Sequence, residues 1–138
     1  MLTTLKMIVG SIVFAVLLDY VWIGKVMARF YKSQIGGILR TSGDSMNPHI
    51  PTAILVYVAL TCLVVFFVLP LIPEGASYLK VFGYGALFGF LIYCFYDLTN
   101  FSVFSVWPLA ITLVDIAWGT FLVGATTVVA EFIHRISA

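Results

Sequence analysis

Four long apolar stretches dominate this chain and constrain its fold more than any other feature. They cover about residues 4–27, 50–69, 78–100 and 107–133, and a membrane-spanning helix needs about 20 such residues. Only 9% of the 138 residues are charged and 62% are hydrophobic, which leaves too few charges to solvate a globular surface. The sequence therefore predicts an all-α integral membrane protein, with one four-span domain over residues 1–138.

The connections between the spans are marked by proline and are short, with one exception. The segments are N-P-H-I-P before the second span, L-P-L-I-P-E-G after it, and W-P before the fourth. Short connections predict antiparallel neighbours, and hence an antiparallel four-helix bundle. Both chain ends then lie on one side of the membrane, called side A, and the long first connection lies on side B. Lys and Arg are divided almost evenly between the two sides, which favours neither orientation.

The long first connection, residues 25–49, has an amphipathic pattern. At 100° per residue its basic side chains gather on one side of a helical wheel, and the apolar ones lie opposite. The basic set is Lys25, Arg29, Lys32 and Arg40, and the apolar set is Val26, Met27, Phe30, Tyr31 and Ile38. This pattern predicts an interfacial amphipathic segment after the first span, interrupted near Gly36-Gly37. The alternative is a solvated basic loop that only anchors the topology.

Three of the six acidic residues, Asp19, Asp97 and Asp115, fall inside the predicted spans toward their side B ends. A charged residue near the centre of a membrane helix costs about 2.5–3.5 kcal/mol on insertion scales, so such residues usually have a function. At 1.5 Å per residue all three lie roughly 5–12 Å below the side B surface. We expect them to face the bundle interior and to converge. We also expect at least one to carry a proton at neutral pH, because burial and mutual repulsion disfavour the charged form.

Aromatic and amide side chains accompany these acids at helical spacing. Asp19 and Asp115 each belong to a D-x-x-W motif, which puts each acid and its tryptophan on one helix face. In the third span, a stripe at i, i+4 and i+7 consists of Tyr93, Asp97 and Asn100. The predicted ligand- or proton-binding residues are Asp19, Asp97, Asp115, Asn100, Trp22, Trp118 and Tyr93. The second span has few polar groups, so we expect it to be the lipid-facing wall.

The cluster is compatible with three classes of function. The first is binding or proton-coupled transport of a small amphiphilic, cationic compound, through charge and cation–π attraction. Transport requires a homodimer or larger assembly, because four helices rarely enclose a pathway. Gly85 and Gly89 at G-x-x-x-G spacing offer an interface, although most such motifs pack a neighbouring helix of the same chain. The second is a membrane-embedded acid/base enzyme that acts on a lipid or isoprenoid. The third is a structural or accessory subunit, in which the acids bond indole N–H groups and lock the helices together.

Other partners and cofactors are weakly indicated. The three aspartates and Asn100 offer only oxygen ligands, which suit Mg, Mn or Ca, and His49 lies on the same side, but we expect no metal. No nucleophile, phosphate-loop or nucleotide motif is present, so we expect no cofactor and assign no catalytic residue. A net charge of +1 favours no nucleic acid, and membrane lipids are the expected surroundings. Cys62 and Cys94 are expected to be buried thiols.

Four motifs carry a resemblance that covers essentially the whole chain. They are L-D-Y-V-W-I-G (residues 18–24), F-Y-K-S-Q-I-G (30–36), Y-D-L-T-N (96–100) and W-P-L-A-I-T-L-V-D-I-A-W-G (107–119). As a set they resemble a family of small bacterial membrane proteins, the domain of unknown function 2177. The resemblance implies a four-span protein of the bacterial inner membrane and implies no particular activity. Its motifs contain the acids and tryptophans selected above, which supports a shared site near side B.

Overall fold

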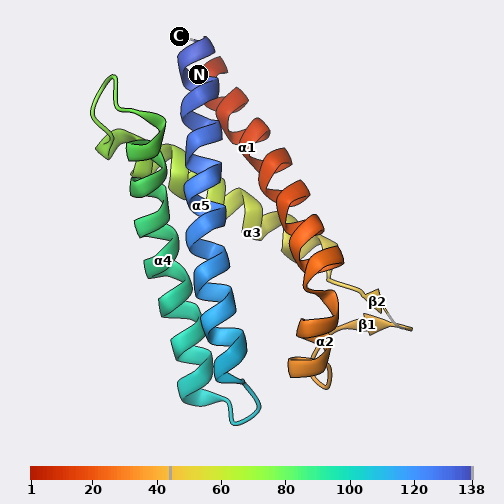
Figure 1. Cartoon of the computed structure of the whole chain (residues 1–138). Helices are drawn as coiled ribbons and strands as arrows, with labels where there is room; N and C mark the ends of the chain where they lie inside the picture. The colour runs from red at the N-terminus through yellow and green to blue at the C-terminus, as the bar shows by residue number, and fades with distance from the viewer. Residues whose placement is uncertain (44, 138) are drawn as a thin grey trace.

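The computed structural model describes residues 1–43 and 45–137, so that Asp44 and Ala138 of the expected domain lie outside it. Four helices are long and apolar enough to cross a membrane, which confirms the predicted all-α membrane bundle (Figure 1). Two of them contain π-helical turns. Helix α1 (Leu2–Val21) continues through the turn η1 (Trp22–Val26). Helix α3 (Ile50–Leu63) continues through the turn η2 (Val64–Val68) and a 3₁₀ turn, η3 (Leu69–Leu71). The remaining two are α4 (Tyr78–Val103) and α5 (Leu109–Ser137).

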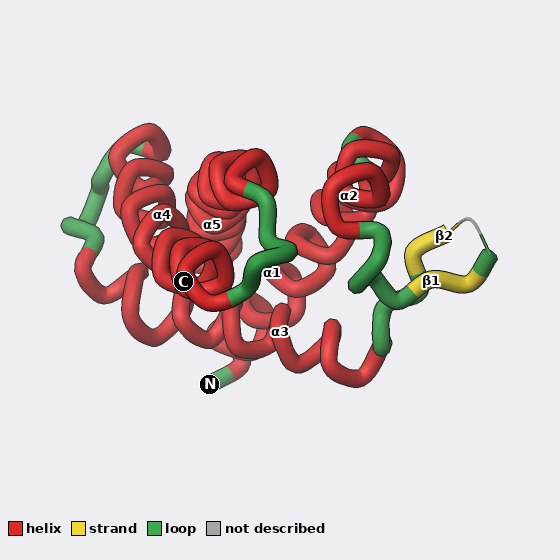
Figure 2. Tube along the Cα trace, turned by 90° about the horizontal axis from the view of Figure 1, so that it is seen from below, coloured by secondary structure: helices red, strands yellow, loops and turns green. Residues whose placement is uncertain are grey.

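Helix α5 occupies the centre of the bundle. It packs against α4 on one side and α1 on the other, and α3 crosses obliquely behind them (Figures 1 and 2). The two chain ends lie at the same end of the molecule, as predicted, and the Thr3 hydroxyl donates to the carbonyl oxygen of Ser137 at 3.4 Å. Successive helices therefore run in opposite directions, and the bundle is antiparallel.

Glycine allows α4 and α5 to approach closely. A Cβ atom on Gly85 would lie 2.8 Å from the carbonyl oxygen of Val123, and one on Gly89 would lie 2.8 Å from the Val123 Cβ. Positions four residues apart on α4 thus meet positions four residues apart on α5, in reverse order. We call this series the α4–α5 row, and its facing pairs are Gly85 with Thr127, Gly89 with Val123, and Tyr93 with Gly119. The G-x-x-x-G motif is therefore used within the chain, as the alternative to a dimer interface predicted.

The first connection folds as an amphipathic helix, as predicted. Helix α2 (Ala28–Ile35) ends at Gly36 and buries Tyr31 and Ile35 against Ile111 of α5, and its basic residues are exposed. The sequence did not predict the short antiparallel pair that follows, β1 (Thr41–Ser42) with β2 (Ser45–Met46). Three of the four paired residues are polar, and the segment has no apolar alternation that would mark a strand. Gly43, with φ of 59°, adopts the left-handed conformation that a tight turn requires.

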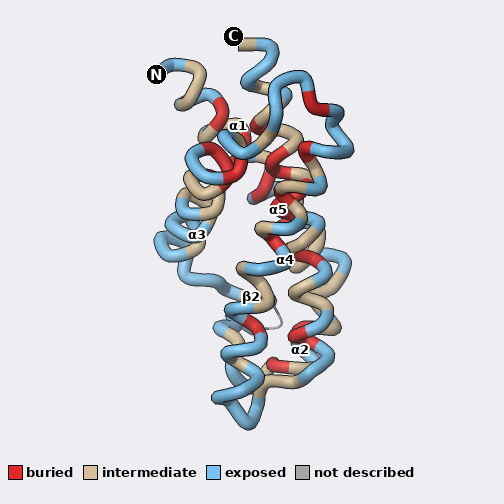
Figure 3. Tube along the Cα trace, turned by 90° about the vertical axis from the view of Figure 1, so that its left-hand side faces the viewer, coloured by how far each residue is buried: buried red, intermediate tan, exposed pale blue. Residues whose placement is uncertain are grey.

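Exposed positions occur along all four long helices (Figure 3). Many of these positions carry large apolar side chains, which lipid contact accommodates and water does not. Examples on each helix are Leu5 and Leu17, Leu55 and Phe67, Leu79 and Phe95, and Leu113 and Phe132. The outer surface of the bundle is thus suited to a bilayer, and the polar side chains treated below lie inside it.

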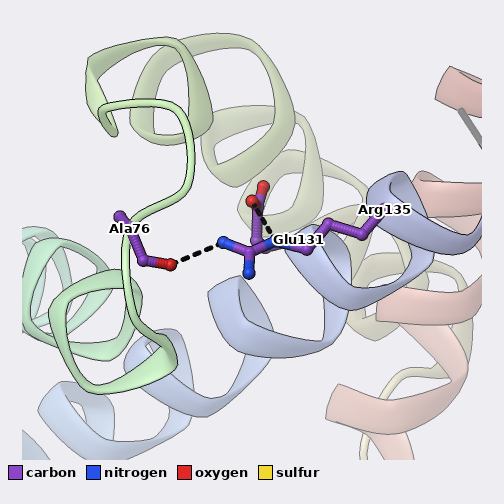
Figure 4. Close-up of polar contacts among 3 residues, drawn as sticks. All are labelled: Ala76, Glu131 and Arg135. Atoms are coloured by element: carbon purple, nitrogen blue, oxygen red, sulfur yellow. Dashed lines mark hydrogen bonds and ion pairs between the residues drawn. The ribbon is translucent and has the colours of Figure 1, made fainter.

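Arg135 ties the end of α5 to the connection before α4 on side A (Figure 4). Its Nε donates to Glu131 at 2.8 Å, and its Nη2 donates to the Ala76 carbonyl oxygen at 2.6 Å. Its guanidinium also lies 4.7 Å from the centroid of the Tyr78 ring. Arg135 thus has three contacts that fix the helix ends, and those with Ala76 and Tyr78 could not be predicted from the sequence.

The α4–α5 row makes a testable prediction about stability. Gly85→Ala should lower the free energy of unfolding by about 1–3 kcal/mol, because the added methyl meets backbone that cannot move aside. Gly83→Ala is the matched control on the same helix, since nothing lies within 4 Å of a Cβ at that position. Thermal unfolding in detergent measures both variants. Equal melting temperatures for the two would contradict the close approach of α4 and α5.

Candidate functional site

Asp19 joins three helices. It is 8% exposed and ends a buried stripe along α1. Its Oδ1 accepts a hydrogen bond from Nε1 of Trp118 on α5 at 2.6 Å, and its Oδ2 accepts one from the hydroxyl of Tyr57 on α3 at 2.9 Å. Each carboxylate oxygen therefore accepts a hydrogen bond from a different helix, so both oxygens of this buried acid have a partner inside the bundle.

The two tryptophans of the D-x-x-W motifs meet each other. Trp22 and Trp118 are stacked, with ring centroids 4.3 Å apart and an angle of 4° between the planes. Trp22 lies at the start of the π-helical turn, and Ala15 and Leu122 pack beside the pair. The Trp22 indole also interacts with the hydroxyl of Tyr31, although its N–H has no partner at hydrogen-bond geometry. The aromatic pair closes the interface between α1 and α5.

Asp115 is covered by the amphipathic helix. The hydroxyl of Tyr31, from α2, donates a hydrogen bond to Asp115 Oδ1. Tyr31 is only 6% exposed, and burial, followed by the neighbouring Asp115, raises the pKa of its hydroxyl above the ordinary value near 10. Tyr31 therefore keeps its proton and remains a donor. Helix α2 therefore covers Asp115, and the hydrogen bond from Tyr31 holds the helix there.

Asp97 has no such partner. It is fully buried, and neither carboxylate oxygen forms a hydrogen bond with any residue that the structure describes. The next step of the α4–α5 row brings Asp97 opposite Asp115, and the two carboxyls interact electrostatically. Tyr93, one turn away on the same face, lies within electrostatic range of all three aspartates. Asp97 and Asp115 form a facing pair across two closely packed helices.

The three acids lie within electrostatic range of one another's neighbours but do not form a metal site. Among the described residues, no three His, Cys, Asp or Glu side chains are placed to hold a metal ion. Asp115 interacts electrostatically with both Asp97 and Asp19, and Asp19 in addition has its own two donors. Asn100 is half-buried on the Asp97 face, and His49 is exposed and bonds Thr52 at 2.7 Å.

Two surface depressions accompany this arrangement. A groove on the outer face of α4 follows the turns that carry Asp97 and is lined by Cys94, Phe95, Leu98, Thr99, Ser102 and Val103. The other lies beside the hairpin and is lined by Arg40, Thr41, Asn47, Pro48, His49, Ile50 and Pro51. Neither of these two depressions is lined by an aspartate. Both cysteines are half-buried free thiols.

Sequence reasoning missed two tyrosines. The second span was expected to be a lipid-facing wall, and this is wrong for Tyr57, which reaches Asp19 because α3 crosses the bundle. Tyr31 was placed only on the apolar face of the connection. The available signal was the residue type, since a buried tyrosine hydroxyl usually finds a hydrogen-bond partner.

The contacts of Asp19 predict its contribution to stability. Tyr57→Phe should lower the free energy of unfolding by about 0.5–2 kcal/mol, because one buried carboxylate oxygen loses its donor. Tyr20→Phe is the control, since this ring lies on the exposed surface of the same helix as Asp19. Unfolding in detergent, followed by circular dichroism, compares the two. Equal stability of both variants would show that the Tyr57 hydroxyl does not hold α3 to α1.

The burial of Tyr31 predicts its titration. Because its pKa is raised, the neutral hydroxyl stabilises the docking of α2 below about pH 10, and this contribution is lost only as the pH rises through the folded value. Tyrosinate absorbance at 295 nm measures this. Folded Tyr31→Phe should gain as much absorbance as wild type between pH 9 and 11, and the unfolded variant should show one tyrosine fewer of seven. A smaller gain by the folded variant would contradict the buried position.

Comparisons with known proteins place the chain in a family. A family model described as a predicted membrane protein, DUF2177, matches residues 4–132. No curated protein and no solved structure matches the chain. Among the helices that the structure describes, the matched region contains all of α3 and α4 and most of α1 and α5, together with the three aspartates and both stacked tryptophans. The chain therefore belongs to the DUF2177 family of membrane proteins.

Proposed function

We propose that this membrane protein binds a small amphiphilic cation in exchange for a proton, and that the Asp97–Asp115 pair is the binding site. The observation that carries the proposal is the state of Asp97, which is fully buried with both carboxylate oxygens free of any described partner. Asp19, by contrast, has a donor for each oxygen. The unsatisfied acid is the one available to a ligand.

Electrostatics favours either a proton or a cation at this pair. An isolated carboxylate is very costly inside a membrane unless it is neutralised or paired. Two facing carboxylates also repel each other, so that neutralising one of them relieves the other. A proton and a monovalent cation satisfy the pair in the same way, which makes their exchange at one site the expected chemistry.

The surroundings favour a ligand with apolar parts. Tyr93 lies within electrostatic range of the acid pair, and in this proposal its aromatic ring contributes to binding of the cation. The groove on α4, lined mainly by apolar side chains, follows the same helical turns and faces the lipid. In this proposal Asn100 orients the ligand, and Trp22 and Trp118, held by Asp19, form the rigid wall of the site.

Helix α2 controls access from side B in this proposal. The Tyr31 hydroxyl already occupies one oxygen of Asp115, so a ligand that takes both acids must displace it. Movement of a ligand across the bilayer requires more than these four helices, and we propose a homodimer as the transporting unit. The resemblance to bacterial proteins supports the bacterial inner membrane as its location.

A second role is favoured for Asp19 alone. Its donors come from α3 and α5, and the first span supplies the acid, so this residue has the contacts of a structural junction. In this proposal Asp19 maintains the geometry of the pair without exchanging its partners for a ligand. The structural interpretation thus applies to one acid and the binding interpretation to the other two.

Binding of tetraphenylphosphonium, a small lipophilic cation, tests the proposal. Wild-type protein in lipid nanodiscs should bind it with release of about one proton per cation, detected with a pH indicator in weak buffer. Affinity should fall as the pH is lowered, because protons compete for the same carboxyls. Asp97→Asn should weaken binding roughly tenfold or more, since the fixed negative charge is lost.

Glu131→Gln is the matched control for this measurement. Glu131 also lies within a span, but it is paired with Arg135 at the opposite end of α5. The control should bind like wild type. Equal affinity of wild type and Asp97→Asn, or binding without proton release, would contradict the proposed exchange.

A further inference from the structure

The short hairpin after α2 holds a basic residue beside the start of the second span. Its strands pair Thr41 with Met46, and they lie next to the first turn of α3 (Figure 2). The pairing continues one step further, because the backbone N–H of Asn47 donates to the Arg40 carbonyl oxygen at 2.8 Å. Asn47 precedes Ile50, the first residue of α3, by only three positions. The hairpin thus brings Arg40 to the side B end of this span.

A surface depression of about 480 Å³ lies between the hairpin and α3, and both Arg40 and His49 line it. This volume is within the range of small-molecule binding sites in proteins. Both side chains are exposed, and Arg40 forms no ion pair with an acid that the structure describes. The Nδ1 atom of His49 lies 2.7 Å from the Thr52 hydroxyl oxygen, which orients the ring. An arginine in this position is suited to an anion, because its guanidinium can bind two phosphate oxygens at once.

The depression lies at the level of lipid headgroups. Residues Ile50–Leu71 form a membrane-span candidate of 22 residues, which at 1.5 Å per residue is about 33 Å long. That length suffices for a hydrocarbon core about 30 Å thick, so the first residues of the span mark its boundary on side B. Ile50 lines the depression, and Ile54 lies one turn further along the same helix face. At 60% and 54% exposed, the two side chains provide an apolar surface that leads from the depression into the membrane.

The charge of the surrounding segment favours an anionic partner. Residues 25–49 contain four Lys or Arg residues and one Asp. Lys25 and Arg29 are exposed on side B, and the Lys25 ammonium lies 5.5 Å from the centroid of the Tyr20 ring on α1. Basic residues beside a membrane span attract negatively charged lipids to the adjacent surface.

We propose that this depression binds the headgroup of an anionic phospholipid, with the phosphate on Arg40 and the acyl chains along Ile50 and Ile54. A soluble phosphate gains only the charge attraction, whereas a lipid also keeps its chains in contact with the apolar helix surface. For this reason the site is assigned to a lipid. It is separate from the Asp97–Asp115 pair and does not depend on the proposed function.

Native mass spectrometry in detergent tests the site, with dioleoylphosphatidylglycerol as the anionic lipid and dioleoylphosphatidylcholine as the zwitterionic one. Wild type should retain the anionic lipid in preference. Arg40→Gln should lower the affinity for it about five- to tenfold and abolish the preference, because one arginine at an anionic lipid surface contributes on that order. Glycerol phosphate, which carries a phosphate without acyl chains, should leave no adduct.

Arg29→Gln is the matched control, since it removes the same charge from side B at an exposed position that does not line the depression. It should bind both lipids like wild type. Without lipid, both variants should melt at the wild-type temperature, because both side chains are exposed. Equal losses of affinity in the two variants, or no loss in Arg40→Gln, would overturn the site. Retention of glycerol phosphate would overturn its assignment to a lipid. Because the probe is an anionic lipid, failure here is distinguishable from a failure of tetraphenylphosphonium binding.

Discussion

The close approach of α4 and α5 is the constraint on which the rest of the structure depends. Glycines on α4 bring its backbone against Val123 and Thr127, and no α4 side chain separates the two helices there. This packing fixes the register, and the register in turn sets Asp97 opposite Asp115. Within a bilayer, where apolar side chains gain nothing by leaving lipid, small residues and interhelical polar bonds are the available sources of helix association. In this chain, small residues join α4 to α5, and interhelical polar bonds join α1 to α5.

The three intramembrane acids are distinguished by their donors. Asp19 has an indole and a phenol, Asp115 has one phenol, and Asp97 has no described donor. Residues at a similar depth and of identical type thus have different chemical environments. An acid that holds helices together needs hydrogen-bond donors for its oxygens, whereas an acid that binds a ligand needs oxygens without donors. The different numbers of donors therefore separate a structural role for Asp19 from a binding role for Asp97.

Several parts of this arrangement could be predicted from the sequence. The apolar runs and the prolines between them place the four spans, because hydrophobic length and missing N–H groups act locally. The level of the three acids follows from their distance to the span ends. The pairing of Tyr57 with Asp19 could not be predicted, because it depends on the oblique crossing of α3. The sequence also could not show which helix Gly85 and Gly89 contact, because small residues occur at helix interfaces both within and between chains.

The difference between the acids also lay beyond the sequence. D-x-x-W suggests that each acid is associated with its own tryptophan, whereas Asp19 bonds the tryptophan of the other motif. Helical spacing describes one helix at a time, and this contact joins two. The contact between Tyr31 and Asp115 could not be predicted for the same reason, because the two residues lie 84 positions apart on different helices.

The separation of Asp19 from its partners has a consequence for biogenesis. Tyr57 follows it by 38 residues and Trp118 by 99. During synthesis the first helix therefore enters the membrane with an acid whose donors have not yet been made. The phenol becomes available with the second span, and the indole only with the fourth. Helix α5, the last to be made, thus supplies the second donor for Asp19 of α1. Because α5 lies at the centre of the bundle, assembly finishes there.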